Sequence, residues 1–130
     1  MILDTSFLID LFDGRNAAFE KGVELTESKT IQRVPAPVVM ELSYGTVFGG
    51  EDERRNVQNV LKMYPIVEQD ERIAHRAGQL LAEADINAGG ESGIDKVDPM
   101  VAAVADLYDE PVLTDNAYDF EALGVDVESY

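Results

Sequence analysis

Three acidic residues occupy positions where a carboxylate needs an explanation. Asp4 ends a short apolar run at the start of the chain, and Asp98 stands directly before a proline at the head of the most apolar helical segment. Glu41 has apolar side chains or glycine three and four residues away, so its charge would lie on an apolar helix face. An ionised carboxylate there is costly unless it has a partner such as an arginine, binds a metal ion or takes part in catalysis.

A fourth acidic position follows the apolar run at residues 111–113. Its polar side chains are Thr114, Asp115, Asn116 and Asp119. Each acidic position taken alone also has an ordinary structural explanation, because Asp-Asn pairs suit turns and both Asp4 and Asp98 have the chemistry of helix caps. The four positions together carry the functional argument, because a parallel sheet would bring them to one edge, where ligands bind.

The donor set of this predicted cluster is restricted to oxygen. The chain has no cysteine and a single histidine, His75, which excludes thiolate and His-rich zinc sites. Carboxylates held close together repel one another unless a cation neutralises them or some of them hold protons. Oxygen ligands suit Mg²⁺ or Mn²⁺. Such an ion also binds phosphate oxygens and stabilises the charge that develops when a phosphodiester is cleaved, so the sequence predicts metal-dependent phosphoester hydrolysis.

The segments that position these residues alternate between helices and short strands. Apolar spacing and breaker residues predict helices over 5–13, 16–27, 35–48, 51–63, 70–84, 98–108 and 118–123, strands over 1–4, 31–34, 65–67, 110–114 and 125–127, and a loop over 86–96. Strands separated by helices indicate βαβ units, a largely parallel sheet and an α/β fold. The 130 residues fit a single domain, 1–130.

The composition is strongly acidic, with 26 acidic against 10 basic residues and a formal net charge of -16. At about 1 M salt the Debye length falls to about 3 Å, which removes most of the resulting repulsion. We therefore expect a salt-loaded cytoplasm, as in a halophile; the alternative is an acidic protein of ordinary salinity that avoids polyanions. No run approaches the roughly 18 apolar residues of a membrane span, and the first residues lack signal-peptide features. We expect a cytoplasmic protein with no membrane contact.

Taken in order, four segments resemble the PIN domain, specifically the toxin ribonucleases of VapBC-type toxin–antitoxin pairs. These segments are Ile2–Asp10, Val38–Leu42, Asp98–Ala105, and Val112–Asn116 followed by Asp119-Phe120. The resemblance covers nearly the whole chain. It implies a PIN-like three-layer α/β/α fold with a short, mostly parallel central sheet, and the acidic composition suggests a halophilic archaeon as the source.

The resemblance also implies roles for individual residues. Asp4 and Asp98 would be the principal Mg²⁺ ligands, and Glu41 would complete the acidic pocket and help activate water. Ser6, Thr114 and Asn116 would lie behind the ligands, where hydroxyl or amide groups orient them. The family often has an aspartate two residues after the threonine, where this chain has Asn116. Either Asp115 or Asp119 would then supply the missing charge, and one or two metal ions remain possible.

The activity implied by the resemblance is endonucleolytic cleavage of RNA by the toxin component of a type II toxin–antitoxin system. The implied partners are an RNA substrate, a cognate antitoxin whose tail covers the active site, and a second copy of the chain in a homodimer. The residues expected to touch RNA or protein are Arg54, Arg55, Arg72 and Arg76 for the RNA backbone, and the regions Phe12–Phe19 and Val57–Tyr64 for an antitoxin or dimer surface.

Two other functions stay open from the sequence. A phospho-acceptor receiver domain also gathers aspartates around Mg²⁺, but it needs paired acids after the first strand and a lysine after the last, whereas Asp4 stands alone and no lysine follows Lys96. A catalytically inactive PIN module that only binds RNA or protein is the other alternative, because Asn116 replaces an acid.

Overall fold

The computed structural model describes all residues from 1 to 130. Its helices are α1 (Thr5–Phe12), α2 (Asn16–Glu27), α3 (Ala36–Thr46), α4 (Glu51–Met63), α5 (Glu71–Ala88), α6 (Val97–Tyr108) and α7 (Ala117–Ala122); its strands are β1 (Ile2–Leu3), β2 (Val34–Pro35), β3 (Ile66–Val67), β4 (Val112–Leu113) and β5 (Val127–Glu128). The helices predicted over 16–27 and 51–63 have those bounds. The strands are two residues each, shorter than predicted.

All strand pairs are parallel. β4 pairs with β1 and β5, and β3 pairs with β2. A bridge between Ile2 and Arg33 joins the two groups, because the Leu3 N–H donates to the Arg33 carbonyl and the Arg33 N–H donates to the Met1 carbonyl, each at 2.9 Å. The strand order is therefore β3-β2-β1-β4-β5. The chain adds β2 and β3 on one side of β1 and then crosses to add β4 and β5 on the other, which makes the carboxyl end of β1 a topological switch point.

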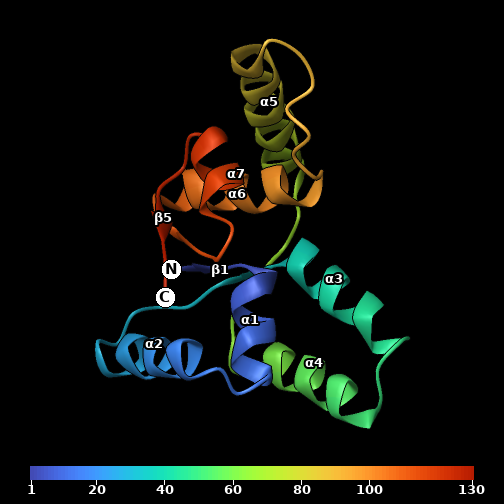
Figure 1. Ribbon diagram of the computed structural model, residues 1–130, viewed down its shortest axis with the longest axis vertical. Helices are drawn as coiled ribbons and strands as arrows, with labels where there is room; N and C mark the ends of the chain where they lie inside the picture. The colour runs from blue at the N-terminus through green and yellow to red at the C-terminus, as the bar shows by residue number, and fades with distance from the viewer.

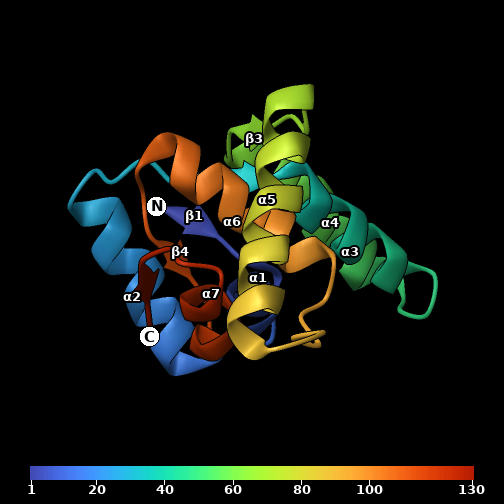
Figure 2. The same ribbon diagram turned by 90° about the horizontal axis from the view of Figure 1, so that it is seen from above.

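Helices cover both sides of this short sheet, as predicted. In Figure 1, α1, α2 and α4 lie on one side of β1, and α5, α6 and α7 lie on the other. Figure 2, seen from above, shows α3 and α4 packed together and extending away from β1, whereas α5 crosses over α6. The three-layer α/β/α arrangement with a parallel central sheet is thus confirmed. None of the helices is both long and apolar enough to span a lipid bilayer.

The core fixes the residues that precede the predicted site. Ile2 and Leu3 of β1 are fully buried, and so are Val112 and Leu113 of β4. Helix α6 is buried along most of its length between the sheet and α5, and its buried stretch is 101–105. Removing such surface from water contributes about 25 cal/mol per Å² of apolar area, so the backbone on either side of the predicted site is firmly held.

Three local predictions are wrong. Helix α5 continues to Ala88, so residues 86–88 are helical and not part of a loop; the helix ends where Gly89 adopts a φ of 77°, which glycine takes without strain. Helix α6 begins at Val97, one residue earlier than predicted. Asp10 lies on the predicted first helix, and its amphipathic pattern predicts a solvated position for this acid, but Asp10 is 8% exposed, because Tyr130 donates a hydrogen bond to it and Arg15 forms an ion pair with it.

Candidate active site

Asp4 lies at the carboxyl end of β1, at the switch point of the sheet. Its backbone N–H donates to the Leu113 carbonyl at 3.1 Å, so the residue is still paired with β4 while its side chain extends past the strand. The carboxylate is 6% exposed and accepts hydrogen bonds at Oδ2 from Thr114 Oγ1 at 2.8 Å and Ser6 Oγ at 3.1 Å. Burial raises the pKa of Asp4, and these hydrogen bonds offset the increase only in part.

Thr114, at the end of β4, connects the two strand ends. Its hydroxyl is fully buried, accepts from the Asn116 N–H at 3.0 Å and lies 3.2 Å from Ser6 Oγ. Ser6 Oγ in turn accepts from the Asp115 N–H at 3.2 Å. The hydroxyls expected behind the ligands therefore contact Asp4 directly and hold its carboxylate in one orientation.

Glu41 reaches the same edge from α3. The Thr5 hydroxyl donates to Glu41 Oε1 at 2.6 Å, and no arginine pairs with it. Burial raises the pKa of Glu41, and the charges of Asp4 and Asp95 add to the increase against the hydrogen bond from Thr5. The other carboxylate oxygen, Oε2, has no hydrogen bond within the protein.

Asp98 lies in the first turn of α6, and its carboxylate does not cap the helix. The cap interaction comes from Asp95, whose Oδ1 accepts from the Val97 N–H at 2.8 Å. Asp98 is left with one contact, from the Asn116 side-chain amide at 3.5 Å. Burial, followed by the charges of neighbouring carboxylates, raises the pKa of Asp98 to about 7. The contributing carboxylates are Asp4, Asp119, Asp95 and Glu41.

The two candidates for the fourth acid lie beside different carboxylates. Asp119, on α7, accepts from the Asn116 amide at 2.8 Å, and its charge raises the pKa of Asp98. Asp115 is exposed, and its charge acts on Asp4. Asn116 itself donates toward both Asp98 and Asp119, so it holds one carboxylate beside the other.

Asp4, Glu41 and Asp119 each raise the pKa of Asp98 through their charge, so the four residues lie near one another. We call this cluster the acidic pocket, and the protein supplies no positive charge there. None of the salt bridges involves any of these residues. No three of the acidic side chains lie close enough together to ligate one ion directly. Mg²⁺ is ordinarily held by one or two carboxylates and several waters, so the oxygen-only donor set fits this ion or Mn²⁺.

Two contributors to the pocket were absent from the sequence-based site. Thr5 positions Glu41, and Asp95 adds negative charge and caps α6. Thr5 directly follows Asp4, so its position beside the site followed from the prediction for Asp4. Asp95 gave no such signal, because it lies in a segment predicted to be an ordinary loop.

The arginines expected to contact RNA are not all free. Arg76 pairs with Asp106 at 2.7 Å, and Arg55 lies 3.8 Å from Asp52. Arg54 and Arg72 are exposed and form no ion pair. Helix-surface pairing therefore accounts for part of this group, and exposed pairs of this kind contribute little to stability.

A known protein family and several solved structures match nearly the whole chain. The family model of the PIN domain matches residues 1–125. A search among curated proteins found no match to the sequence. Among solved structures, VapBC2 from Rickettsia felis bound to a DNA fragment from its promoter matches with a TM-score of 0.83 at 18% identity, covering 99% of this chain and 97% of that chain.

Two further solved structures show the same fold. FitAcB from Neisseria gonorrhoeae matches with a TM-score of 0.73 at 25% identity, over 97% of this chain and 94% of that chain. VapC20 from Mycobacterium tuberculosis, described as a sarcin-ricin loop cleaving toxin, matches with a TM-score of 0.72 at 17% identity, over 95% of each chain.

Proposed function

This chain belongs to the PIN-domain family, and from that premise we propose that it is a metal-dependent endoribonuclease, the toxin of a type II toxin–antitoxin pair. The observation that carries the nuclease proposal is the acidic pocket, which gathers carboxylates from four separate segments without a balancing cation. The toxin proposal is supported by the similarity to VapBC and FitAcB structures.

Asp4 and Asp98 are the residues that would hold a Mg²⁺ or Mn²⁺ ion. Their positions fit, because each carboxylate is partly or fully withdrawn from water and neither has a cationic partner. A bound divalent ion would supply the positive charge that stabilises the developing negative charge at the scissile phosphate and would lower the pKa of a coordinated water.

The residues around the ligands fix their geometry and accept the proton. Thr114 and Ser6 hold Asp4 through its Oδ2. Thr5 holds Glu41 through Oε1, which leaves Oε2 free to accept a proton from the attacking water. The raised pKa of Glu41 makes it a stronger base than an exposed glutamate.

Asp119 is the fourth acid of this proposal. It is the candidate whose charge acts on Asp98, and the Asn116 amide fixes its position. An amide in place of a carboxylate at Asn116 removes one negative charge from the pocket, so the proposal is for a single resident ion.

The acidity of the chain makes RNA binding dependent on ionic conditions. With a net charge of -16, the protein repels a polyanion at low salt. At about 1 M salt this repulsion is confined to about 3 Å. We therefore place the activity in a salt-rich cytoplasm.

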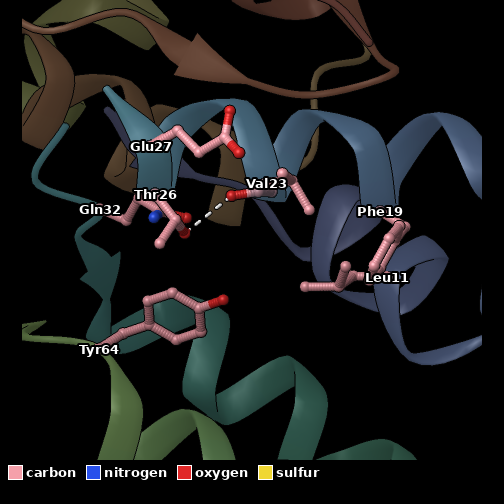
Figure 3. A pocket seen from close by; sticks show the side chains of 8 residues that line it. Leu11, Phe19, Val23, Thr26, Glu27, Gln32 and Tyr64 are labelled. Atoms are coloured by element: carbon pink, nitrogen blue, oxygen red, sulfur yellow. Dashed lines mark hydrogen bonds between the residues drawn. The ribbon is translucent and has the colours of Figure 1, made fainter. Parts of the chain in front are cut away.

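The antitoxin is proposed to dock on a hollow between α1, α2 and the end of α4. The hollow has a volume of about 280 Å³, and Tyr64 lies across it from α2, with Leu11 and Phe19 toward its other end (Figure 3). Phe19 is 61% exposed, which is unusual for a phenylalanine without a partner. Phe19 lies in one of the regions expected to form a partner surface and Tyr64 in the other, and a segment with apolar side chains fits the chemistry of this lining.

A second copy of the chain is proposed to pack on α3. Met40 and Tyr44 on α3, with Val47 and Phe48 directly after its end, form an exposed apolar stripe, and Tyr44 and Phe48 contact each other with ring centroids 5.2 Å apart. Met40, Tyr44 and Val47 are spaced four and three positions apart, so they project from the same side of the last turns of the helix. This stripe lies outside both regions expected from the sequence.

The PIN-family match argues against the receiver-domain alternative. The inactive PIN module is the second candidate, and the observation that favours it is Asn116 at the position where an acid is common. In this alternative the pocket would bind an ion or RNA without cleaving it.

The proposed activity is tested by incubating the purified protein with a randomised single-stranded RNA pool and with structured cellular RNA, at high salt with Mg²⁺ or Mn²⁺. We expect cleavage that a chelator abolishes and that Asp4→Asn and Asp98→Asn each lower by about two to three orders of magnitude. Asp126→Asn is the matched control, because Asp126 is an exposed acid whose side chain has no hydrogen-bond partner. Cleavage by Asp4→Asn and Asp98→Asn at the rate of the parent protein would refute the site, and RNA binding without cleavage by the parent would favour the inactive module.

A further inference from the structure

A second hollow adjoins the acidic pocket and has no role in the site described above. It has a volume of about 340 Å³ and lies between the carboxyl end of α5, the segment that leads into α6, and α7. Its lining includes Asn87, Ser92, Ile94, Tyr118 and Glu121. Tyr118 is 81% exposed, the most exposed of the large hydrophobic side chains in the chain.

Both walls of this hollow continue into the acidic pocket. Tyr118 directly precedes Asp119, and both residues are on α7. On the other wall, Ile94 directly precedes Asp95, whose charge acts on both Glu41 and Asp98. The hollow is therefore one residue away from the acidic pocket along both segments, and consecutive Cα atoms are about 3.8 Å apart.

The wall opposite Tyr118 is held in place by hydrogen bonds. Asp85, on α5, accepts from both the backbone N–H and the hydroxyl of Ser92, the former at 2.9 Å. These bonds hold the pKa of Asp85 below its usual range. Asp85 thus fixes the position of Ser92 in the lining, and a wall that is already fixed reduces the ordering cost of binding.

We propose that this hollow is a nucleobase subsite, in which a base next to the cleaved phosphodiester stacks on Tyr118. The proposal deepens the nuclease function and rests on it. Exposed aromatic rings stack nucleobases in proteins that bind single-stranded RNA. Asn87 and Ser92 provide amide and hydroxyl groups for the polar edge of a base.

The charge of the lining selects a base over a phosphate. Glu121 is the charged residue of the lining, and no lysine or arginine lines the hollow. A phosphate there would be repelled, whereas a neutral base with exocyclic amino groups can donate to the carboxylate. The flat ring, the polar edge and the absence of positive charge therefore fit the same ligand.

The test compares Tyr118→Ala, Tyr118→Phe and Tyr108→Ala with the parent protein. Tyr108 is the control, because it is an exposed tyrosine at the end of α6, outside the lining of the hollow. Cleavage of the randomised single-stranded RNA pool is followed by sequencing of the new ends, which gives both the rate and the base preference at each position around the cut. The same proteins carrying Asp98→Asn are titrated with the labelled pool to measure binding without cleavage.

We expect Tyr118→Ala to lower kcat/KM by about 5- to 150-fold and to weaken binding of the pool by a similar factor. It should also erase the base preference at one position beside the cut. Tyr118→Phe should retain the rate, the binding and the preference, because the ring remains, and Tyr108→Ala should match the parent.

Unchanged kcat/KM, binding and base preference in Tyr118→Ala, with an active parent, would overturn the subsite and leave the nuclease function intact. A loss in Tyr118→Phe equal to that in Tyr118→Ala would also overturn it, because the hydroxyl and not stacking would then be responsible. A parent that neither cleaves nor binds the pool or structured RNA would overturn both proposals, which separates the two failures.

Discussion

Partly buried carboxylates lie at both ends of the central strand β1, and their pKa values are shifted in opposite directions. At the amino end, Glu110 accepts from the Met1 ammonium at 2.7 Å and from Arg33 Nε at 3.0 Å, and the Arg33 guanidinium lies 4.5 Å from the centroid of the Tyr108 ring. Burial alone would raise the pKa of Glu110, but these hydrogen bonds and positive charges hold it below its usual range. This acid is neutralised by the protein itself.

At the carboxyl end, only a few residues away along β1, the protein provides hydroxyls and an amide but no cation. The pKa values of Asp4, Glu41 and Asp98 are all raised, first by burial and then by the charges of neighbouring carboxylates. The protein thus supplies cations to the carboxylate of Glu110 at the amino end of β1, whereas it supplies none to the carboxylates at the carboxyl end. The difference supports our proposal that a divalent ion from solution supplies the positive charge at this edge.

The largest predicted difference between the two ends of β1 is in catalysis. Asp98→Asn should lower the rate of RNA cleavage by about two to three orders of magnitude, the loss typical of removing one electrostatic contact to a transition state. Glu110→Gln should leave kcat unchanged under conditions where the protein is fully folded. Equal losses in both variants, measured in the same RNA cleavage assay, would remove the distinction between the two ends.

A smaller catalytic effect is expected from the hydroxyl that orients Glu41. Thr5→Val removes the 2.6 Å hydrogen bond to Oε1 and should lower kcat by about tenfold, as for groups that orient the residues of a metal site. Thr5→Ser should restore most of the rate, because it keeps the hydroxyl. A thermal unfolding midpoint shared by Thr5→Val and Thr5→Ser would separate this effect from a loss of stability.

At the amino end, a substitution of Glu110 should lower the stability of the protein. Glu110→Gln should lower the free energy of unfolding by about 1 kcal/mol at neutral pH, the scale of a partly exposed ion pair. Because the pKa of Glu110 is lower in the folded than in the unfolded protein, this contribution is complete above the ordinary glutamate pKa of about 4.3 and is lost as the pH falls through the folded value. Urea unfolding of both proteins across this pH range measures the difference, and a constant difference down to low pH would contradict the assignment.

At the carboxyl end, the free energy of unfolding of the metal-free protein should change with pH in the opposite direction. Asp98 has a folded pKa of about 7, above its unfolded value, so the folded state binds this proton more tightly and the free energy of unfolding falls as the pH rises through about 4 to 7. Asp98→Asn should then be more stable than the parent at about pH 8, by about 1 kcal/mol or less after solvent screening, and equal to it near pH 4. Urea unfolding in the presence of a chelator tests this, and a destabilised Asp98→Asn protein at about pH 8 would contradict the account.

The position of Asp4 could be predicted because it depends on local pattern alone. An apolar pair followed by an acid and a helix places that acid at the end of a strand, and the alternation of strands and helices then gives a parallel sheet. The same reasoning brought Glu41 and Asp98 to this edge through the helices that carry them. The strands were overestimated, because apolar residues flanking a two-residue ladder look the same as residues within it.

The parts that could not be predicted depend on contacts between distant residues. Nothing in the sequence shows that Asp95 and not Asp98 would cap α6, since both are acids close to the start of that helix. The burial of Asp10 depends on Tyr130, 120 residues away. Glu110 is paired with the Met1 ammonium and the Arg33 guanidinium at the amino end of the sheet. These contacts depend on the order of the strands in the sheet, which local sequence patterns do not determine.

The central claim is that a divalent ion supplies the charge missing from the acidic pocket, and calorimetric titration of the metal-free protein with Mn²⁺ tests it most directly. At about pH 8, above the pKa of about 7 of Asp98, we expect saturable binding to the parent and to Glu110→Gln, and binding weakened by tenfold or more in Asp4→Asn and Asp98→Asn. Binding to Asp4→Asn and Asp98→Asn as tight as binding to the parent would contradict the account.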